Sequence, residues 1–341
     1  MLSPLRAQDI HFSQFYENAI LRNPALTGIF SGDYKAGVNY RTQWGSIANP
    51  FQTIMASAES RILLSEEHGD YLSYGLAVSY DHAGAIDFNS LQIFPALNYN
   101  KSLEDAHQTY LSVGFSGGYV QRSINYSKMT VDNQWIGGSF DQNASTRETI
   151  TNPRISHWDL SAGLSLNSSI GEDNHINYYV GAAAWHVSKP KEAFNPNENF
   201  IRLTTKYVGS LGVQYRIDNN FAVVLHANYL NQLPYQETMV GGMLNWKYAG
   251  SATHAVPFGI YAGCYWRVKD AIVPTLKVDY DTYTFTMSYD QNTSSLKPAS
   301  AGKGGWEFSI YVRGKLKHLA EARDQMKCPR FEEMQVPDEI K

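Results

Sequence analysis

The chain lacks a hydrophobic run long enough to cross a membrane as a helix. Mean hydropathy is −0.36, and no stretch of the 341 residues approaches the roughly 18 consecutive apolar residues that a spanning helix needs. A helical membrane protein is therefore excluded. A transmembrane β-barrel is not, because its tilted strands cross the bilayer with about 10 residues each.

Cysteine and clustered basic charge are also scarce. Cys264 and Cys328 are spaced unlike any metal motif. Cys264 falls on the apolar face of a predicted strand and Cys328 in a polar tail, and a disulfide between them stays an open alternative. The formal net charge is −4 and no Lys/Arg cluster stands out, so nucleic acid is not an expected partner.

Signatures of catalysis are missing as well. The 10 histidines include no H-E-x-x-H motif and no pair at metal-ligand spacing, and there is no G-x-S-x-G. We therefore expect no enzyme, no metal and no cofactor. A barrel hydrolase with Ser and His on neighbouring strands stays an alternative, with His186 and His226 as its histidines. For His226, on a predicted lumen face, a hydrogen-bonded structural role is favoured.

What the chain has instead is a period-two pattern that recurs from residue 34 to residue 316. In residues 34–44, "YKAGVNYRTQW", apolar or aromatic side chains alternate with polar ones such as Lys35, Asn39 and Arg41. Successive strand side chains point to opposite faces, so each such strand has one apolar and one polar surface. The 23 Tyr and 7 Trp fit the aromatic girdles of an outer-membrane barrel. A Tyr-rich extracellular β-sandwich is the alternative.

These segments predict an all-β fold, a transmembrane antiparallel β-barrel of about 14 strands. The expected strands are residues 34–44, 50–61, 70–81, 89–100, 107–123, 156–167, 174–187, 203–216, 220–231, 237–249, 254–266, 270–279, 282–291 and 303–316. If the first strand runs outward, the two longest connections face outside and the two tightest face the periplasm. That sorting of loop length is typical of outer-membrane barrels.

The pattern divides the chain into four parts. We expect a residual signal or leader at residues 1–7, with a mature start at Gln8, and a plug-like lumen segment at residues 8–33. The barrel follows at residues 34–316. A polar periplasmic tail, whose charge density argues against membrane burial, occupies residues 317–341.

Inward parity also selects candidate binding residues. We expect Arg41, Gln43, Arg122 and Asp159 to contact a partner in the lumen or at its rim, as charge-assisted hydrogen bonds suit an extended peptide. Small inward residues such as Gly114 and Gly163 leave room for a segment of the same chain or of a partner. Mutual pairing of the inward charges is the alternative.

The N-terminal residues resemble a known family. Gln8-Asp9, the "FSQFY" element at residues 12–16, the Asn23-Pro24-Ala25 turn and Gly28 are similar to the opening of the PorP/SprF family of type IX secretion proteins. "YRTQW" at residues 40–44, "VQRS" at residues 120–123 and "DLSAG" at residues 159–163 resemble later family blocks. "CPRF" at residues 328–331 resembles the longer-tailed, SprF-like branch.

The resemblance implies a non-enzymatic component of the outer membrane of a Gram-negative bacterium. Such a barrel would bind and anchor the C-terminal type B signal domain of secreted surface proteins, gliding adhesins among them. It would also dock to periplasmic machinery, namely an OmpA-like peptidoglycan-binding lipoprotein and a lipoprotein ring. A small-solute or fatty-acid transport barrel, which also carries an N-terminal plug, is the alternative function.

Overall fold

The computed structural model describes residues 9–45, 49–65, 69–104, 106–147, 152–171, 173–195, 201–248, 258–294 and 297–315. Among these residues no helix has the length and apolar character needed to cross a membrane. The leader at residues 1–7, Gln8, and the tail at residues 317–341 with Cys328 lie outside the described residues.

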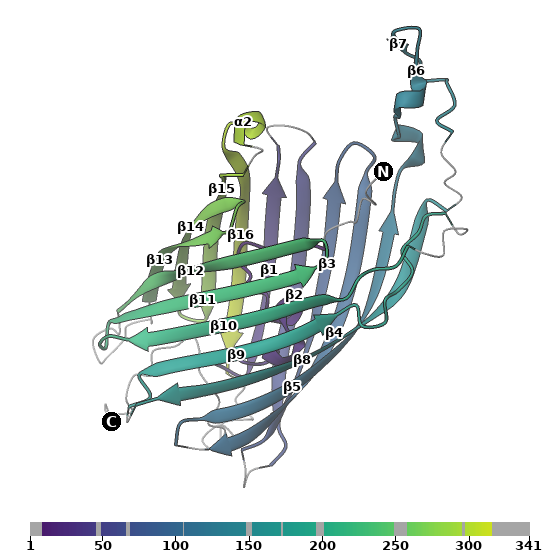
Figure 1. Ribbon diagram of the computed structural model, residues 1–341. Coiled ribbons are helices and arrows are strands. Elements are labelled where there is room, and N and C mark those ends of the chain that lie inside the picture. The colour runs from purple at the N-terminus through teal and green to yellow at the C-terminus, as the bar shows by residue number, and fades with distance from the viewer. Residues whose placement is uncertain are drawn as a thin grey trace.

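Within the described chain, 14 antiparallel strands close into one barrel (Figure 1). Each strand pairs with its neighbour along the chain, and β1 closes the ring against β16, with Tyr34 opposite Gly314. The barrel strands are β1 (Tyr34–Gln43), β2 (Phe51–Leu63), β3 (Tyr71–Ala83), β4 (Phe88–Glu104), β5 (Thr109–Ser123), β8 (Arg154–Ile170), β9 (Ile176–Trp185), β10 (Lys206–Arg216), β11 (Phe221–Gln232), β12 (Tyr235–Tyr248), β13 (Phe258–Arg267), β14 (Ala271–Tyr280), β15 (Tyr283–Asn292) and β16 (Lys303–Gly314).

Each of the 14 predicted segments overlaps one of these strands, so the predicted barrel is confirmed. The boundaries differ by a few residues. One difference is at β9, which ends at Trp185 although the pattern predicts a strand to residue 187. His186 has a φ of 58°, and this left-handed backbone turns the chain out of the ladder.

The barrel is polar inside and apolar outside. On β1, Lys35, Asn39 and Arg41 are buried, whereas Val38 and Tyr40 are exposed. The same alternation continues around the ring, because an antiparallel partner places residues of one face opposite residues of the same face. An exposed apolar belt of this kind suits lipid, and a polar interior suits water or polar chain.

The two ends of the barrel differ. Two long connections, residues 124–153 and 186–205, lie at one end, which we call the outer end because outer-membrane barrels carry their longer loops outside. The first connection contains β6 (Trp135–Ile136) and β7 (Ser139–Phe140), a hairpin that projects beyond the barrel (Figure 1). The start of β1 and the end of β16 lie together at the opposite, periplasmic end.

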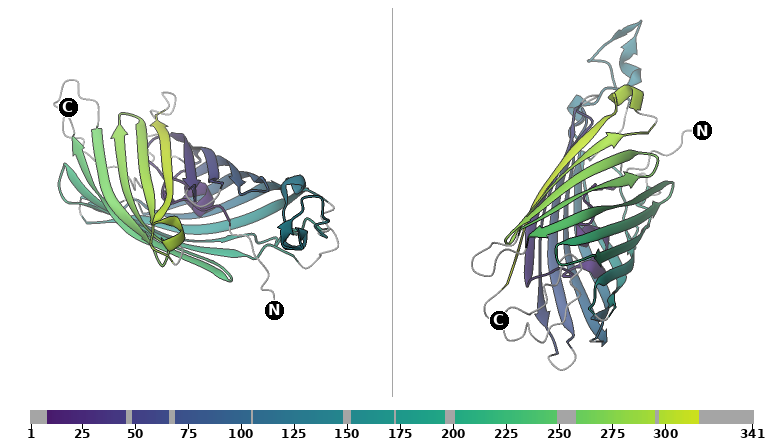
Figure 2. Two further views of the ribbon diagram at one scale, coloured as in Figure 1. Left: turned by 90° about the horizontal axis from the view of Figure 1, so that it is seen from above. Right: turned by 90° about the vertical axis from the view of Figure 1, so that its left-hand side faces the viewer.

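The N-terminal segment, residues 9–33, lies within the ring of strands, where Figure 2 shows it in purple. It contains α1 (Ala19–Arg22) and the 3-10 turn η1 (Pro24–Leu26). All of these residues are buried or half-buried. The segment contacts the outer end through Asp9 and joins β1 at the periplasmic end, so it runs the length of the lumen.

Candidate functional site: the occupied lumen

At the outer end the segment contacts a cluster of Arg122, His186, Lys206 and Asp159 around the Asp9 carboxylate, which we call the carboxylate nest. The Asp9 carboxylate lies 2.6 Å from Lys206 Nζ, 2.7 Å from His186 Nε2 and 4.0 Å from Arg122 Nη2. His186 donates its other ring N–H to Asp159, at 2.7 Å. Each ring nitrogen of His186 faces a carboxylate, and an ionised carboxylate only accepts hydrogen bonds. Both nitrogens therefore carry a proton, and His186 is an imidazolium.

The charges of the nest reinforce one another. Burial lowers the pKa of His186, but the Asp9 charge and the hydrogen bonds to Asp159 and Asp9 raise it to about 9. Burial raises the pKa of Asp9, yet the charges of His186 and Lys206 hold it well below its ordinary value. His186 and Asp9 are therefore both charged at neutral pH.

A second cluster holds the segment just below the nest. Arg41 donates to Asp290 at 2.8 Å and to the His11 carbonyl, and its Nε lies 3.8 Å from Glu307. Glu307 in turn accepts from the backbone N–H groups of Ser13 and Gln14, at 2.7 and 3.0 Å. A buried carboxylate that accepts several N–H donors is compensated for its lost hydration.

The same cluster fixes the side chains of the segment. Ser13 Oγ lies 2.5 Å from Asp290 and accepts from Arg267 at 2.6 Å. The Gln14 amide donates to Ser288 at 3.1 Å and to the Glu307 carbonyl at 2.9 Å. The Ser-Gln pair of the "FSQFY" element thus has a physical role, because it pairs with inward groups of β13, β15 and β16.

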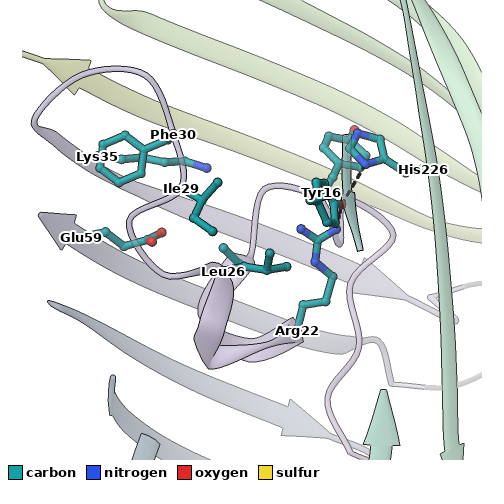
Figure 3. A pocket seen from close by; sticks show the side chains of 10 residues that line it. Tyr16, Arg22, Leu26, Ile29, Phe30, Lys35, Glu59 and His226 are labelled. Atoms are coloured by element: carbon teal, nitrogen blue, oxygen red, sulfur yellow. Dashed lines mark hydrogen bonds between the residues drawn. The ribbon is translucent and has the colours of Figure 1, made fainter. Parts of the chain in front are cut away.

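In the middle of the lumen Glu17 lies between two cations. Its carboxylate is 2.8 Å from Lys277 Nζ and 3.3 Å from Lys35 Nζ. Beside it, Tyr16 stacks on His226 with ring centroids 5.2 Å apart. Figure 3 shows Tyr16 and His226 on one side of a small pocket and Lys35 on the other.

His226 lies inside the barrel, as its parity predicts. It is buried and forms a hydrogen bond with Tyr179 Oη at 3.2 Å. Tyr179 also accepts from Arg22 Nη1 at 2.7 Å. The ring is therefore enclosed by aromatic and cationic groups.

The Asn23-Pro24-Ala25 turn is held differently, by close backbone approach. Asn23 Oδ1 accepts from the Ala25 N–H at 2.9 Å, and its amide donates to the Leu164 carbonyl at 3.1 Å. A Cβ at Gly114 would overlap the Pro24–Ala25 peptide, and a Cβ at Gly163 would overlap the Asn23 side chain. The small inward residues therefore make room for the chain's own turn.

The rest of the turn is bound through its carbonyls and N–H groups. Asn98 donates to the carbonyls of Ala25 and Thr27, at 3.0 and 2.8 Å. Gly28, with a φ of 78°, presents its N–H to Glu59 at 2.8 Å. Arg61 donates to the Phe30 carbonyl at 3.2 Å. Side chains of the wall thus pair with several backbone groups of the turn, as burial of an irregular segment requires.

The four predicted partner-binding residues are all on the barrel wall. Arg41 belongs to the second cluster, and Arg122 and Asp159 belong to the nest. Gln43, the last residue of β1, is half-buried. Three of the four thus contact the N-terminal segment directly or through one residue, so the inward charges pair within the chain. Whether they also bind a partner stays a prediction.

Sequence reasoning missed the groups with which these residues pair. Asp290 and Arg267 are buried at the centre of the second cluster, and Asp9 and Lys206 at the centre of the nest. Inward parity in "YTFTMSYDQN" and a family-like Gln-Asp were the available signals. Neither signal shows which residues are in contact when they lie roughly 200 or more positions apart in the sequence.

Two of the cavities in the described part of the chain adjoin the segment, and both of these are small. One of about 30 Å³ is bordered by Tyr16, Arg22 and His226 (Figure 3). Another of about 50 Å³ is bordered by Ile10, Phe12 and Lys206. A cavity of roughly 150 Å³ is the size that accepts benzene, so each holds little more than water. In the described part of the chain, no cluster of His, Cys, Asp and Glu could hold a metal ion.

The fold and the occupied lumen define an outer-membrane barrel with an internal N-terminal segment. The sequence matches the family "Type IX secretion system membrane protein PorP/SprF" over residues 5–312. The chain belongs to this family, and its place is the outer membrane. No curated protein matches the sequence.

Solved structures support the barrel class. The Ralstonia pickettii toluene transporter TbuX is similar with a TM-score of 0.50 at 10% identity, over 87% of this chain and 93% of that one. A Pseudomonas aeruginosa FadL homologue has a TM-score of 0.50 at 10% identity, over 86% and 92% of the two chains. At such identity the likeness concerns the fold alone.

Proposed function

We propose that this chain is a binding component of type IX secretion and not an enzyme. It retains at the cell surface the C-terminal, type B signal domain of secreted surface proteins such as gliding adhesins. The observation that carries the proposal is the occupied lumen. A wall whose charges already hold residues 9–33, with cavities of about 30 and 50 Å³, suits binding better than conduction.

The outer end offers a surface for such a partner. The β6–β7 hairpin carries Trp135, Ile136 and Phe140, which are 62%, 58% and 41% exposed. The hairpin that carries these side chains projects beyond the end of the barrel (Figure 1). Aromatic residues of this kind supply much of the free energy in protein interfaces.

The test combines Trp135→Ala with Phe140→Ala and measures how much secreted adhesin stays on the cell surface. We expect retention to fall at least about tenfold, as for the loss of interface hot spots. Ile217→Ala is the matched control, because Ile217 is 52% exposed in the turn between β10 and β11 at the opposite end. Unchanged retention in the double variant would remove the hairpin from the interface.

The partner itself is identified by isolating the barrel from native membranes in mild detergent. Recovery of a large secreted protein that ends in a type IX signal domain supports the anchoring function. Reproducible recovery of no such protein contradicts it. We also propose docking to an OmpA-like peptidoglycan-binding lipoprotein and a lipoprotein ring. Removal of residues 317–341 is then expected to abolish their co-purification while the barrel stays in the membrane.

Transport of a small apolar solute is the second candidate. The fold of the two similar transport barrels and the apolar residues Ile10, Phe12 and Leu21 around one cavity favour it. The size of that cavity, about 50 Å³, argues against a continuous path. Planar-bilayer conductance or solute uptake by the wild-type barrel would support transport, and a closed, solute-impermeable barrel would contradict it.

A further inference from the structure

The carboxylate nest is built by the wall and not by the residue that fills it. Arg122 comes from the end of β5, Lys206 from the start of β10, and His186 from the connection between β9 and β10. Their side chains are 7%, 8% and 5% exposed. The N-terminal segment contributes one group to the nest, the Asp9 carboxylate.

Each of the three cations has a second partner that holds it in place. His186 donates to Asp159 at 2.7 Å, and Arg122 pairs with Glu192. Lys206 Nζ lies 5.0 Å from the centre of the Trp185 ring, a cation–π contact. The donors are therefore pre-organised, and their geometry does not depend on Asp9.

The charges of the wall leave the nest unbalanced without Asp9. With His186 protonated by its contact with Asp159, three cations face two carboxylates, Asp159 and Glu192, so one buried positive charge remains without Asp9. An uncompensated buried charge is costly, and the nest will take up another carboxylate when Asp9 leaves. Ile10, which follows Asp9 in the chain, borders the neighbouring cavity together with Phe12 and Leu230, so an apolar residue after the incoming carboxylate takes the place of Ile10.

We propose that the nest of Arg122, His186 and Lys206 is a carboxylate-binding site at the outer mouth, which Asp9 occupies as a resident ligand. Its incoming ligand is an acidic residue of an extended secreted chain, followed by an apolar residue. This proposal rests on the proposed anchoring function, and it names the place at the outer mouth where the secreted chain binds. Binding exchanges one carboxylate for another, so the buried charge stays balanced throughout.

The first test asks whether the nest binds a carboxylate from solution. In the full-length Asp9→Ala protein in detergent, sodium formate is expected to raise the melting temperature by about 2 °C or more over sodium chloride of equal ionic strength. Wild-type protein, whose nest is filled, is expected to show no such difference. Adding Lys206→Met to Asp9→Ala is expected to abolish it.

Asp87→Ala provides the matched control. Asp87 pairs with Lys128 at 2.7 Å, but that lysine is 53% exposed, so its loss leaves a solvated cation and no formate-specific shift. Equal melting temperatures of Asp9→Ala in formate and chloride would overturn the proposal. If Asp9→Ala does not fold, the cell assay below decides with the isosteric Asp9→Asn.

The second test measures retention of the secreted protein on cells. Asp9→Asn weakens the resident ligand and is expected to raise retention severalfold, whereas Lys206→Met is expected to lower it about tenfold. A merely structural role predicts loss in both variants. Opposite signs support the site, and loss or no change in both overturns it. If cells that lack the barrel retain the secreted protein as well as wild-type cells do, the anchoring function is contradicted, independently of the result of the formate melting experiment.

Discussion

The two halves of the N-terminal segment are held in the lumen by different forces. Residues 9–18, the charged half, are tied by ion pairs of Asp9 and Glu17 and by the carboxylates of Asp290 and Glu307. Residues 23–32, the turn half, present backbone groups to Asn98, Glu59 and Arg61 and fit closely against glycine.

This difference indicates which half of the segment a partner can replace and which half stays in place. An ion pair can be replaced by another group of the same charge, and it responds to pH and competing ligands. Close backbone packing has no such substitute, because interiors tolerate little change in volume. The outer half of the segment is thus suited to exchange with a partner, and the periplasmic half to permanent attachment next to β1.

The largest expected effect comes from Glu17→Gln in the charged half. It leaves Lys35 and Lys277 buried without their shared carboxylate, and breaking such a pair costs about 3–5 kcal/mol. Denaturant unfolding of the barrel in detergent micelles measures the loss. Glu104→Gln is the control, since Glu104 pairs with His107 at the surface, where we expect about 1 kcal/mol or less. Equal losses would show that burial is irrelevant at Glu17.

A change of pH is expected to act on the charged half alone. The pKa of His186 is raised to about 9 from an ordinary value near 6.5. Its stabilising contribution is therefore complete below about pH 6.5 and is lost as the pH rises through 9. We expect the loss to be on the order of 2–3 kcal/mol.

Limited proteolysis of residues 9–18 between pH 7 and pH 10 measures this loss. The titratable groups around His186 are Asp9, Asp159, Lys206, His157 and Glu192. His186→Gln removes the titrating group, so cleavage in that variant should be raised at pH 7 and change little up to pH 9. If cleavage of the wild type stays constant through pH 10, the claim that a charged His186 stabilises residues 9–18 is contradicted.

The smallest expected effect comes from the turn half. Gly114→Ala adds a methyl group that overlaps the Pro24–Ala25 peptide, and we expect a loss of about 1–3 kcal/mol. Gly209→Ala is a matched control on β10, where a Cβ meets no atom within 4 Å. That change should be neutral or slightly stabilising. Thermal unfolding of both variants gives the comparison, and equal melting temperatures would contradict close packing of the turn.

Much of the wall followed from the sequence. The period-two pattern located every barrel strand, since lipid outside and polar chain inside impose opposite chemistries on alternate residues. It also placed Arg41, Arg122, Asp159 and His226 on the inner face. It did not reveal the β6–β7 hairpin, whose two-residue strands are too short to show a period.

The pairs inside the lumen did not follow. Ser13 meets Asp290 and Gln14 meets Glu307 over more than 270 residues of chain. Parity says which face a side chain occupies, but not which distant residue it meets across the barrel. That depends on the register of all 14 strands and on the path of residues 9–33, which carry no periodic signal of their own.

The sequence by itself determined a β-barrel with an apolar outside, a polar inside and a family-like N-terminus, because alternation is a local property of each strand. The sequence also predicted a lumen segment at residues 8–33, but tertiary structure alone decided which groups of the wall hold residues 9–33. Only closure of the ring brings Asp9 to Lys206 and Glu17 to Lys277, and burial then makes those charges depend on one another.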